Sequence, residues 1–598
     1  MRILLLTHSF NSLTQRLFGV LRQQGHDVSV ELDIADAVTE EAVALFRPDI
    51  VLAPFLKRRI PETIWSGTVC LVVHPGVPGD RGPSALDWAL TRGDTQWGVT
   101  VLQAAADFDA GEVWAWEPFA LRAQATKSSL YRREVTQAAE VAVLRAIERY
   151  ESGRLCPAPA TGGNPLVLTG QWHPLMLQEH RRIDWLQDGT LTVLRKIAAA
   201  DGSPGVVDAM FGQACRLFDA HPASAAVVAQ FVSSPPGDVV ARRGPALLRR
   251  TIDGAVWIGH VRLVEGLQLK LAATRVFAHA AGALPELAVP LMRDALEWDE
   301  LRYREFGPLE ERVGWLDFEF HNGAMSERQC LRLRDALRWI RTRPTQVLVL
   351  AGGQEFFSNG IHLHDIEAAQ RVAGDSAADA SWRNINAMND AALEVLTLTD
   401  RITVAALHGN AGAGGCFLAL AADLVWAHDG VVLNPHYKNM GNLYGSEYWT
   451  YSLVRRVGEA ASADLMAQRL PILGAQALAS QLLDACLASN AVEFGPMVLE
   501  RALALASAHN LAQSLQTKQV QRIADENRKA LAAYREEELQ RMNRNFYGFD
   551  PSYHVARHHF VYRKPLAWTP RHLAIHRDAA SCIAKSVQHE LSQPVGHE

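Results

Sequence analysis

The sequence of 598 residues lacks a long apolar run, a cysteine pair and an excess of charge of one sign. Its seven cysteines are scattered and form no C-x-x-C motif, which favours a reduced, cytoplasmic protein without a structural zinc site. No stretch approaches the roughly 18 apolar residues that cross a bilayer, and the first apolar run is too short for a signal peptide. A formal net charge of -6 gives no reason to expect nucleic acid or a membrane as partner.

The length exceeds what a single hydrophobic core can support and indicates three or four domains. Apolar residues make up 48% and charged residues 21% of the chain, as is typical of a globular protein. We predict a first domain over 1–155, a second over 165–275, a linker over 276–312, a third domain over 313–544 and a tail over 545–598.

In the first domain, short apolar runs alternate with amphipathic segments, a pattern that favours a parallel α/β sheet. The predicted strands are 3–7, 28–32, 50–53, 68–73 and 98–102, and the predicted helices are 13–24, 35–46 and 127–150. No G-x-G-x-x-G follows the first strand, so we expect no dinucleotide site. Gln15 and Arg16 instead lie where a polar loop enters a helix and could meet an anionic ligand. A capped helix with an exposed arginine explains them equally well.

One strand of this domain ends in the sequence HPGVPGDRGP, which delivers His74 to the carboxyl end of the sheet, where α/β folds bind ligands. A later loop carries Asp109, so an imidazole and a carboxylate are available for acid/base chemistry. These loops resemble the H-x-x-x-P-x-x-R-G and D-x-G motifs of the folate-dependent formyltransferases, at His74, Arg81 and Asp109. The resemblance implies a Rossmann-like domain, 10-formyltetrahydrofolate as formyl donor, His74 and Asp109 as catalytic residues, and Arg81 as a cofactor-binding residue. It departs from the family at Val72, where the family has asparagine.

A Pro/Gly-rich stretch at 155–167 reads as a linker, and a region with R-I-D-W and D-G-S-P-G sequences follows at 182–185 and 201–205. This region resembles the small β-barrel domain at the C-terminus of methionyl-tRNA formyltransferase. The formyltransferase resemblance therefore covers about 270 residues from the start of the chain.

A new α/β pattern begins near residue 313, with a predicted strand at 315–321, a helix at 326–341 opened by a serine cap, and a strand at 345–350. Two glycine-bearing loops follow strands, at 352–363 and 408–418. They resemble the F-S-x-G-x-x-L and G-x-A-x-G-G-G loops of the enoyl-CoA hydratase (crotonase) family, although Ala413 replaces one glycine. The resemblance implies a crotonase fold in which the N–H groups of Ile361 and Gly414 hold the thioester oxygen of an acyl-CoA.

The third domain lacks the two glutamates that a hydratase uses to position water. Phe417 stands at the first of these positions, and the segment after the next strand reads NPHYKNMG. Ordinary hydration is therefore excluded. Tyr437 and Glu447 remain as a phenol and a carboxylate that could move a proton next to the oxyanion hole. The alternative is a satisfied core tyrosine and a surface glutamate on a helix over 445–454.

Other candidate contacts with the phosphates or adenosine of CoA are Arg132, Ser203, Asn322 and Arg563, each of which could equally be an ordinary surface residue. His554 and His558, and His362 and His364, have metal-ligand spacing but no evident third ligand, so we predict no metal site.

A formyltransferase half followed by a crotonase half resembles a family of nickel-iron hydrogenase maturation factors. The resemblance implies formyl transfer from 10-formyltetrahydrofolate to CoA and then decarbonylation of formyl-CoA to carbon monoxide. Formyl-CoA is the one compound that is both a product of the first chemistry and a substrate for the second. A hydrogenase large-subunit precursor or other maturation proteins are possible partners. The alternatives are separate activities on an amine or sugar nucleotide and on an acyl-CoA, a formyltetrahydrofolate hydrolase or formyltransferase with a CoA-binding regulatory half, and a non-catalytic scaffold.

Overall fold

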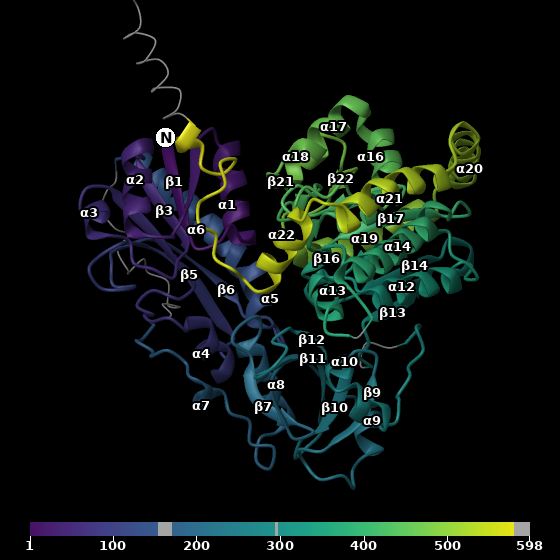
Figure 1. Ribbon diagram of the computed structural model, residues 1–598, viewed down its shortest axis with the longest axis horizontal. Coiled ribbons are helices and arrows are strands. Elements are labelled where there is room, and N and C mark those ends of the chain that lie inside the picture. The colour runs from purple at the N-terminus through teal and green to yellow at the C-terminus, as the bar shows by residue number, and fades with distance from the viewer. Residues whose placement is uncertain (154–169, 294–296, 373, 579–598) are drawn as a thin grey trace, which may run out of the picture. The chain divides into compact units, whose positions relative to one another are not determined.

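The computed structural model describes residues 1–153, 170–293, 297–372 and 374–578. The chain forms two compact units (Figure 1). Unit 1 comprises residues 1–177 together with the C-terminal segment from Pro565, and unit 2 comprises residues 178–564. The predicted linker at 155–167 lies outside the described residues, and the predicted domain boundaries stay a prediction. Among the described helices, none has the length and hydropathy of a bilayer-spanning segment.

Unit 1 contains a six-stranded sheet in the order β2-β1-β3-β4-β5-β6. Its strands are β1 (Arg2–Thr7), β2 (Asp27–Leu32), β3 (Ile50–Phe55), β4 (Val69–His74), β5 (Gln96–Gln103) and β6 (Val113–Ala120). Its helices are α1 (Ser12–Gln23), α2 (Asp36–Phe46), α3 (Glu62–Trp65), α4 (Ala85–Arg92), α5 (Lys127–Arg132) and α6 (Glu134–Glu151). Strands β1, β2, β3 and β5 are buried on both faces almost along their whole length, as is typical of the inner strands of a helix-covered sheet, whereas β6 is partly exposed.

Two local predictions for this unit were wrong. β5 is antiparallel to both β4 and β6, so the sheet is mixed rather than parallel. An antiparallel hairpin needs no crossover helix, and the alternation of segments did not distinguish the two cases. The helix predicted at 127–150 is two helices, broken at Arg133 with φ -110° and ψ -84°. The Thr136 hydroxyl donates to the Tyr131 carbonyl across this break.

The C-terminal segment of unit 1 covers the free edge of β2. The Val30 amide donates to the Leu573 carbonyl at 3.0 Å, and the Leu32 amide donates to the Thr569 hydroxyl at 2.9 Å. Figure 1 shows this yellow segment beside the purple N-terminal elements. Covering the edge removes an exposed row of backbone donors and acceptors.

Unit 2 begins with a six-stranded antiparallel sheet in the order β7-β8-β11-β10-β9, with β12 paired to β11. Its strands are β7 (Val206–Met210), β8 (Gln213–Pro222), β9 (Val239–Arg243), β10 (Ala246–Arg250), β11 (Ala255–Leu263) and β12 (Leu271–Ala272). Its helices are α7 (Gln178–Arg181), α8 (Thr190–Ala200), α9 (Ala225–Ala229), α10 (Ala273–Val276) and α11 (Ala278–Gly282). Val193 and Ile197 of α8 pack on Leu217 and Ile258 of the sheet.

The rest of unit 2 is built on two further sheets. The larger one has the order β13-β14-β15-β17-β19-β22 and the smaller one β16-β18-β20-β21. The strands are β13 (Leu301–Phe306), β14 (Val313–Phe318), β15 (Val347–Gly352), β16 (Phe356–Ser358), β17 (Ile402–Leu407), β18 (Asn410–Gly412), β19 (Leu424–Ala427), β20 (Val432–Asn434), β21 (Ile472–Leu473) and β22 (Ala485–Cys486).

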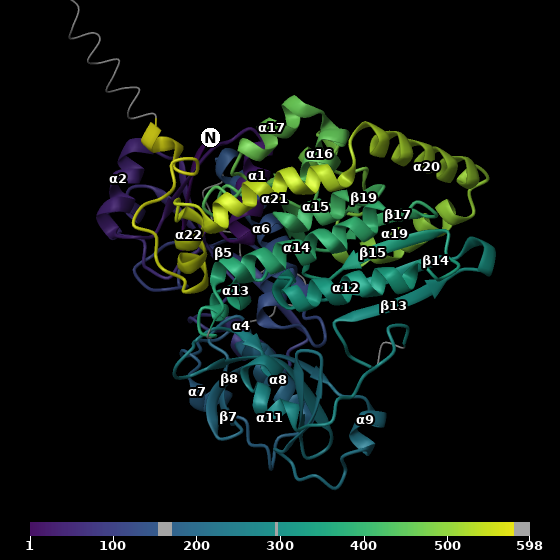
Figure 2. The same ribbon diagram turned by 45° about the vertical axis from the view of Figure 1, so that its right-hand side comes forward.

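Helices surround these two sheets, and α12 and α14 lie side by side in both ribbon views (Figure 2). They are α12 (Glu327–Ile340), α13 (Leu363–Ala369), α14 (Ala377–Leu396), α15 (Gly414–Leu420), α16 (Trp449–Val457), α17 (Glu459–Ala467), α18 (Gly474–Ala479), α19 (Ala491–Ala506), α20 (Leu511–Arg528), α21 (Leu531–Tyr547) and α22 (Ser552–Val561). Ser326 caps α12 in a capping box with Gln329, so the predicted serine cap is confirmed.

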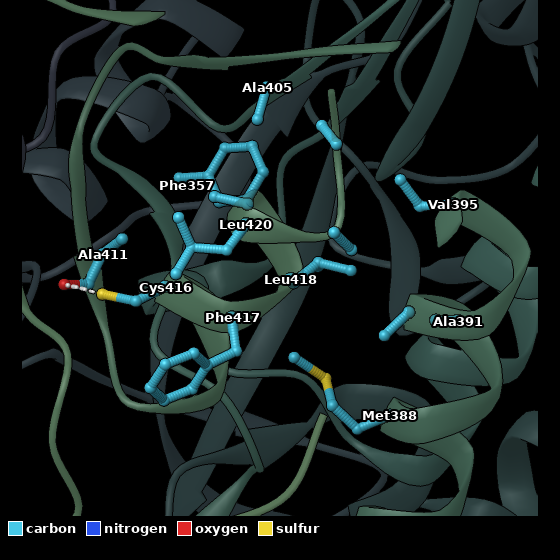
Figure 3. Packing of buried hydrophobic residues seen from close by; sticks show 14 of the residues in the cluster. Phe357, Met388, Ala391, Val395, Ala405, Ala411, Cys416, Phe417, Leu418 and Leu420 are labelled. Atoms are coloured by element: carbon cyan, nitrogen blue, oxygen red, sulfur yellow. Dashed lines mark hydrogen bonds between the residues drawn. The ribbon is translucent and has the colours of Figure 1, made fainter. Parts of the chain in front are cut away.

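Helix α15 lies in the centre of this fold, and all seven of its residues are buried. Figure 3 shows its residues Cys416, Phe417 and Leu418 among Met388 and Ala391 of α14. The Cys416 thiol lies 3.2 Å from the Ala411 carbonyl oxygen. A helix packed on all sides holds its N-terminal glycines in a fixed position, which matters for the site described next.

Candidate active sites

In unit 1, His74 is the last residue of β4 and lies between two carboxylates. Its Nε2 is 2.9 Å from Asp80 Oδ2, and its Nδ1 is 3.5 Å from Asp109 Oδ1. His74 and Asp80 are buried, whereas Asp109 is partly open. The structure therefore brings together His74 and Asp109, as expected from the sequence, and adds a second carboxylate.

Loop geometry holds these groups in place. The Asp109 carboxylate accepts a hydrogen bond of 3.2 Å from the Gly82 amide, and Asp109 itself has a left-handed backbone with φ 53°. A Cβ on Gly76 would lie 2.3 Å from His74 Nε2, so only glycine leaves room for the contact between His74 and Asp80. Gly82 therefore holds Asp109 in place through its amide, and Gly76 leaves the space that His74 and Asp80 need.

Asp80 was not among the residues predicted from the sequence, although it lies inside the HPGVPGDRGP motif. It is buried, and among the described residues its Oδ1 has no hydrogen-bond partner. A buried carboxylate on one ring nitrogen fixes which tautomer the imidazole adopts. An acidic residue six positions after His74 is the signal that could have revealed it.

The four predicted cofactor contacts of unit 1, Gln15, Arg16, Arg81 and Arg132, differ from one another in burial and in hydrogen bonding. Arg16 is buried and forms a two-pronged ion pair with Glu140 at 2.6 and 3.1 Å, so the alternative of an exposed arginine is wrong. The Gln15 side chain donates to the Phe10 carbonyl at 2.9 Å. Arg81 is exposed and Arg132 is half-buried. Binding by these four residues stays a prediction.

In unit 2, the two glycine loops approach each other at the N-terminus of α15. A Cβ on Gly360 would lie 3.3 Å from the Gly414 amide nitrogen, which places the loop that carries Ile361 against Gly414. Gly414 is the first residue of α15, and the first amides of a helix have no acceptor within the helix. Such an amide, with the helix dipole behind it, suits a developing negative charge.

Tyr437 and Glu447 also lie near the N-terminus of α15. The Tyr437 hydroxyl donates to the Glu447 carboxylate, and both side chains are buried. A Cβ on Gly414 would lie 2.4 Å from Glu447 Oε1, so this carboxylate lies directly beside the Gly414 backbone. The alternative of a surface glutamate is therefore wrong. The helix predicted at 445–454 begins only at Trp449, because Glu447 and Tyr448 have left-handed backbones.

Burial changes the acidity of both groups. Loss of solvent, together with the negative charge of Glu538, raises the pKa of Glu447 to about 8, even though the hydrogen bond from Tyr437 acts in the other direction. Burial and the nearby Glu447 raise the pKa of Tyr437 well above its usual value. A carboxyl group with a pKa near neutrality can both accept and release a proton at cellular pH.

Aromatic side chains form the wall of this site. Phe417 stacks on Tyr437 with ring centroids 5.6 Å apart, and Trp449 lies 6.4 Å from Phe417. Phe417 thus fills the position where a hydratase has a carboxylate. The site combines backbone donors with one phenol–carboxylate pair in apolar surroundings.

Two of the three predicted CoA contacts of unit 2 lie near one another. The Arg563 guanidinium is 3.4 Å from the Gly202 carbonyl oxygen, next to Ser203. The Asn322 carbonyl accepts a 2.8 Å hydrogen bond from Asn359, close to Ile361. The structure therefore brings Ser203 and Arg563 together and places Asn322 beside the first glycine loop. Contact with CoA stays a prediction for all three.

Asp219, His260 and His321 form a cluster of metal-ligating types. The Asp219 carboxylate accepts hydrogen bonds from His260 at 2.7 Å and His221 at 2.8 Å. The Lys270 ammonium lies 3.4 Å from His321 Nε2, where its charge opposes a second cation. The bonds already present account for these groups, so the cluster is a hydrogen-bonded network.

Three protein-family models match successive parts of the chain. A formyl transferase model matches residues 20–147, a formyl transferase C-terminal domain model matches residues 176–274, and an enoyl-CoA hydratase/isomerase model matches residues 317–569. The methionyl-tRNA formyltransferase of Syntrophus aciditrophicus is 25% identical over 210 residues, or 34% of this chain and 63% of that protein.

Two proteins are similar along almost the whole chain. The hydrogenase maturation factor HoxX of Bradyrhizobium diazoefficiens is 52% identical over 578 residues, covering 96% of this chain and 97% of that protein. The crystal structure of HypX from Aquifex aeolicus in complex with tetrahydrofolic acid has a TM-score of 0.90 and 44% identity, covering 96% of this chain and 99% of that one.

Proposed function

The chain belongs to the HypX/HoxX family of hydrogenase maturation factors, and we propose that it makes the carbon monoxide ligand of nickel-iron hydrogenase from a formyl group. The formyl donor is 10-formyltetrahydrofolate, and the carrier between the two reactions is CoA. The protein partners that we propose are a hydrogenase large-subunit precursor or other maturation proteins. Formyltransferase and enoyl-CoA hydratase-like domains in one chain support this order of reactions.

In the first reaction, the CoA thiol attacks the formyl carbon of 10-formyltetrahydrofolate. A carbon–sulfur bond forms, the bond to the folate nitrogen breaks, and the thiol proton replaces the formyl group on that nitrogen. His74 stabilises the oxyanion or protonates the leaving nitrogen, and Asp109 orients both His74 and a water that relays the thiol proton. Their mutual distance of 3.5 Å supports these roles.

In the second reaction, the amides of Ile361 and Gly414 polarise the formyl oxygen of formyl-CoA. The formyl proton passes to the carboxylate of Glu447 directly or through Tyr437. The carbon–sulfur bond then breaks with its electron pair on sulfur, carbon monoxide leaves, and the thiolate recovers the proton. The sum is one formyl-CoA converted to carbon monoxide and CoA, with no oxidant or reductant.

The observation that carries the proposal is the position of Glu447, with one carboxylate oxygen beside the Gly414 backbone and the other bonded to Tyr437. Phe417 stands where a hydratase has a glutamate, so this position offers no carboxylate to place a hydrating water. A proton acceptor next to an oxyanion hole suits removal of a proton from a very small acyl group.

Incubation with formyl-labelled 10-formyltetrahydrofolate and CoA tests the proposal, with carbon monoxide trapped on haemoglobin. We expect labelled carbon monoxide that depends on CoA. Labelled formate alone would indicate a hydrolase instead, and no turnover of either compound would indicate a scaffold. The Asp109→Asn variant should still release carbon monoxide from formyl-CoA supplied directly but not from the folate.

A further inference from the structure

The segment that carries Glu447 has an unusual backbone. Glu447 and Tyr448 are consecutive residues with φ of 63° and 60°, immediately before α16. Left-handed conformations are strained for a residue with a side chain, and they persist only where the surroundings enforce them. The groups that enforce this conformation lie on two helices that are far away in the sequence.

Glu538 of α21 holds the segment from one side. Its Oε2 accepts from the Tyr448 amide at 3.0 Å, and its Oε1 accepts from the Thr450 amide at 2.9 Å and the Thr450 hydroxyl at 2.6 Å. The side chain is completely buried. Glu538 therefore caps the start of α16, a role usually filled by a neighbour in the sequence.

Asn389 of α14 holds the segment from the other side. Its Oδ1 accepts from the Glu447 amide at 2.8 Å and from the Ser446 hydroxyl at 2.9 Å. The same hydroxyl lies 3.3 Å from Glu538 Oε2 and so joins the two supports. Among the described residues, the buried Asn389 Nδ2 has no partner, so this asparagine is held by its acceptor side alone.

We infer that Glu538 and Asn389 are positioning residues that hold the Glu447 carboxylate between Gly414 and Tyr437 in the decarbonylation step. The inference rests on the proposed function. Neither residue touches the phenol or the glycine loops in the contacts described above, so each acts through the backbone of Ser446, Glu447 and Tyr448.

Glu538 also affects the pKa of Glu447, because its carboxylate is a buried negative charge close to Glu447. The titratable groups that act on or respond to Glu447 are Tyr437, Glu538 and the Cys330 thiol of α12. Burial raises the pKa of Glu538 to about 7, and its negative charge contributes to the raised pKa of Glu447. Removal of that charge leaves burial as the dominant cause but makes Glu447 easier to ionise.

The test uses Glu538→Gln, with formyl-CoA supplied directly and carbon monoxide measured across pH. We expect kcat to fall about 10–10²-fold at an unchanged KM, because the reacting groups are misplaced while binding is intact. We also expect the midpoint of the rise in kcat/KM to move to lower pH by about half a unit or more. Glu538→Asp should restore the wild-type midpoint, because it retains the charge.

The matched control is Glu537→Gln, the same substitution on the same helix at an exposed residue that pairs with Lys529. It should leave both rate and midpoint unchanged. A folded Glu538→Gln enzyme with the wild-type pH profile overturns the inference. If wild-type enzyme releases no carbon monoxide from formyl-CoA, the proposed function fails instead.

Two further measurements keep the inference falsifiable if Glu538→Gln does not fold. Ser446→Ala removes the hydroxyl that joins Asn389 and Glu538, and should lower kcat at an unchanged KM; an unchanged kcat contradicts the inference. Without substrate, infrared spectroscopy should show a protonated carboxyl band that titrates near pH 8 and is absent from Glu447→Gln. The midpoint of this band should be the same in Glu538→Asp, which retains the charge, and a shifted midpoint in folded Glu538→Asp contradicts the inference.

Discussion

Glu447 differs from a carboxyl group in water because it is buried beside Tyr437 and Glu538. Its sequence neighbours gave no sign of this, and a glutamate before a helix usually lies at the surface. At the scale of single residues, the second site therefore depends on surroundings that raise one pKa to about 8. Ala413 is a second residue whose role cannot be recognised from its type alone, because what distinguishes it is its backbone conformation, with φ 47° and ψ -122°.

The first prediction concerns proton transfer by Glu447. Since the carboxylate must be ionised to accept the formyl proton, kcat/KM for formyl-CoA should rise as the pH rises through about 8. Glu447→Gln should lower carbon monoxide release about 10²–10⁴-fold and remove this rise. Glu459→Gln, at an exposed position, is the control. A Glu447→Gln enzyme with the parental rate and pH profile would contradict the role.

The second prediction concerns Ala413, which precedes α15 with φ 47° and ψ -122°, a region that favours glycine. Strain of about 1–3 kcal/mol at this residue exceeds the about 0.4–1 kcal/mol of chain entropy that glycine adds. Ala413→Gly should therefore increase the free energy of unfolding by about 1 kcal/mol, measured by denaturant titration. Ala419→Gly, inside the same helix, should decrease it. A lower stability for Ala413→Gly would show that the strain is absent.

At the scale of elements, both sites lie where strand ends and loops meet. β4 ends at His74, and the pairing of His74 with Thr100 of the antiparallel β5 fixes that end of the sheet. The Thr100 hydroxyl donates to the Gly76 carbonyl at 2.7 Å and so ties the following loop to β5. In unit 2, the N-terminus of α15 is fixed by burial of the whole helix. The strands and helices thus fix where the loops lie, and the loops carry most of the side chains that could react.

The third prediction follows from the loop after β4. Asp80→Asn removes the negative charge that faces His74 Nε2 at 2.9 Å and allows the wrong tautomer. Formyl-CoA formation should fall about 10²–10⁴-fold, measured with labelled folate, while carbon monoxide release from supplied formyl-CoA stays the same. Asp94→Asn, on a neighbouring loop, is the control. Unchanged formyl transfer by Asp80→Asn would exclude a role for this carboxylate.

At the scale of the whole molecule, the last described segment, residues 565–578, belongs to unit 1 and packs on β2. Glu31 of β2 is completely buried and accepts from His576 at 3.0 Å and Arg577 at 2.8 Å. Burial alone would raise the pKa of Glu31, but the hydrogen bonds from His576, Thr569 and Arg577 outweigh it and lower the pKa below 4.5. This contribution to stability is therefore present above pH 4.5 and is lost as the pH falls.

The fourth prediction tests this C-terminal segment. His576→Ala removes one hydrogen bond to a buried carboxylate and should destabilise unit 1 by about 1.5–3 kcal/mol. Calorimetry should show a lower melting temperature for the transition of unit 1, and the transition of unit 2 should not move. His559→Ala, at an exposed position, is the control. An unchanged melting temperature would mean that the segment contributes little to unit 1.

The sequence by itself determined the formyltransferase-like and crotonase-like folds, and it pointed to His74 with Asp109 and to Tyr437 with Glu447, two pairs that the structure brings together. Apolar runs, glycine-bearing loops and the motifs around His74 and Gly414 are local signals, because steric and burial requirements act on neighbouring residues. Only the tertiary structure decided that β5 runs antiparallel, that Asp80 faces His74, and that Glu538 and Asn389 support Glu447. These contacts join residues that are brought together by packing, and the Glu447 pKa depends on burial that no short stretch of sequence specifies.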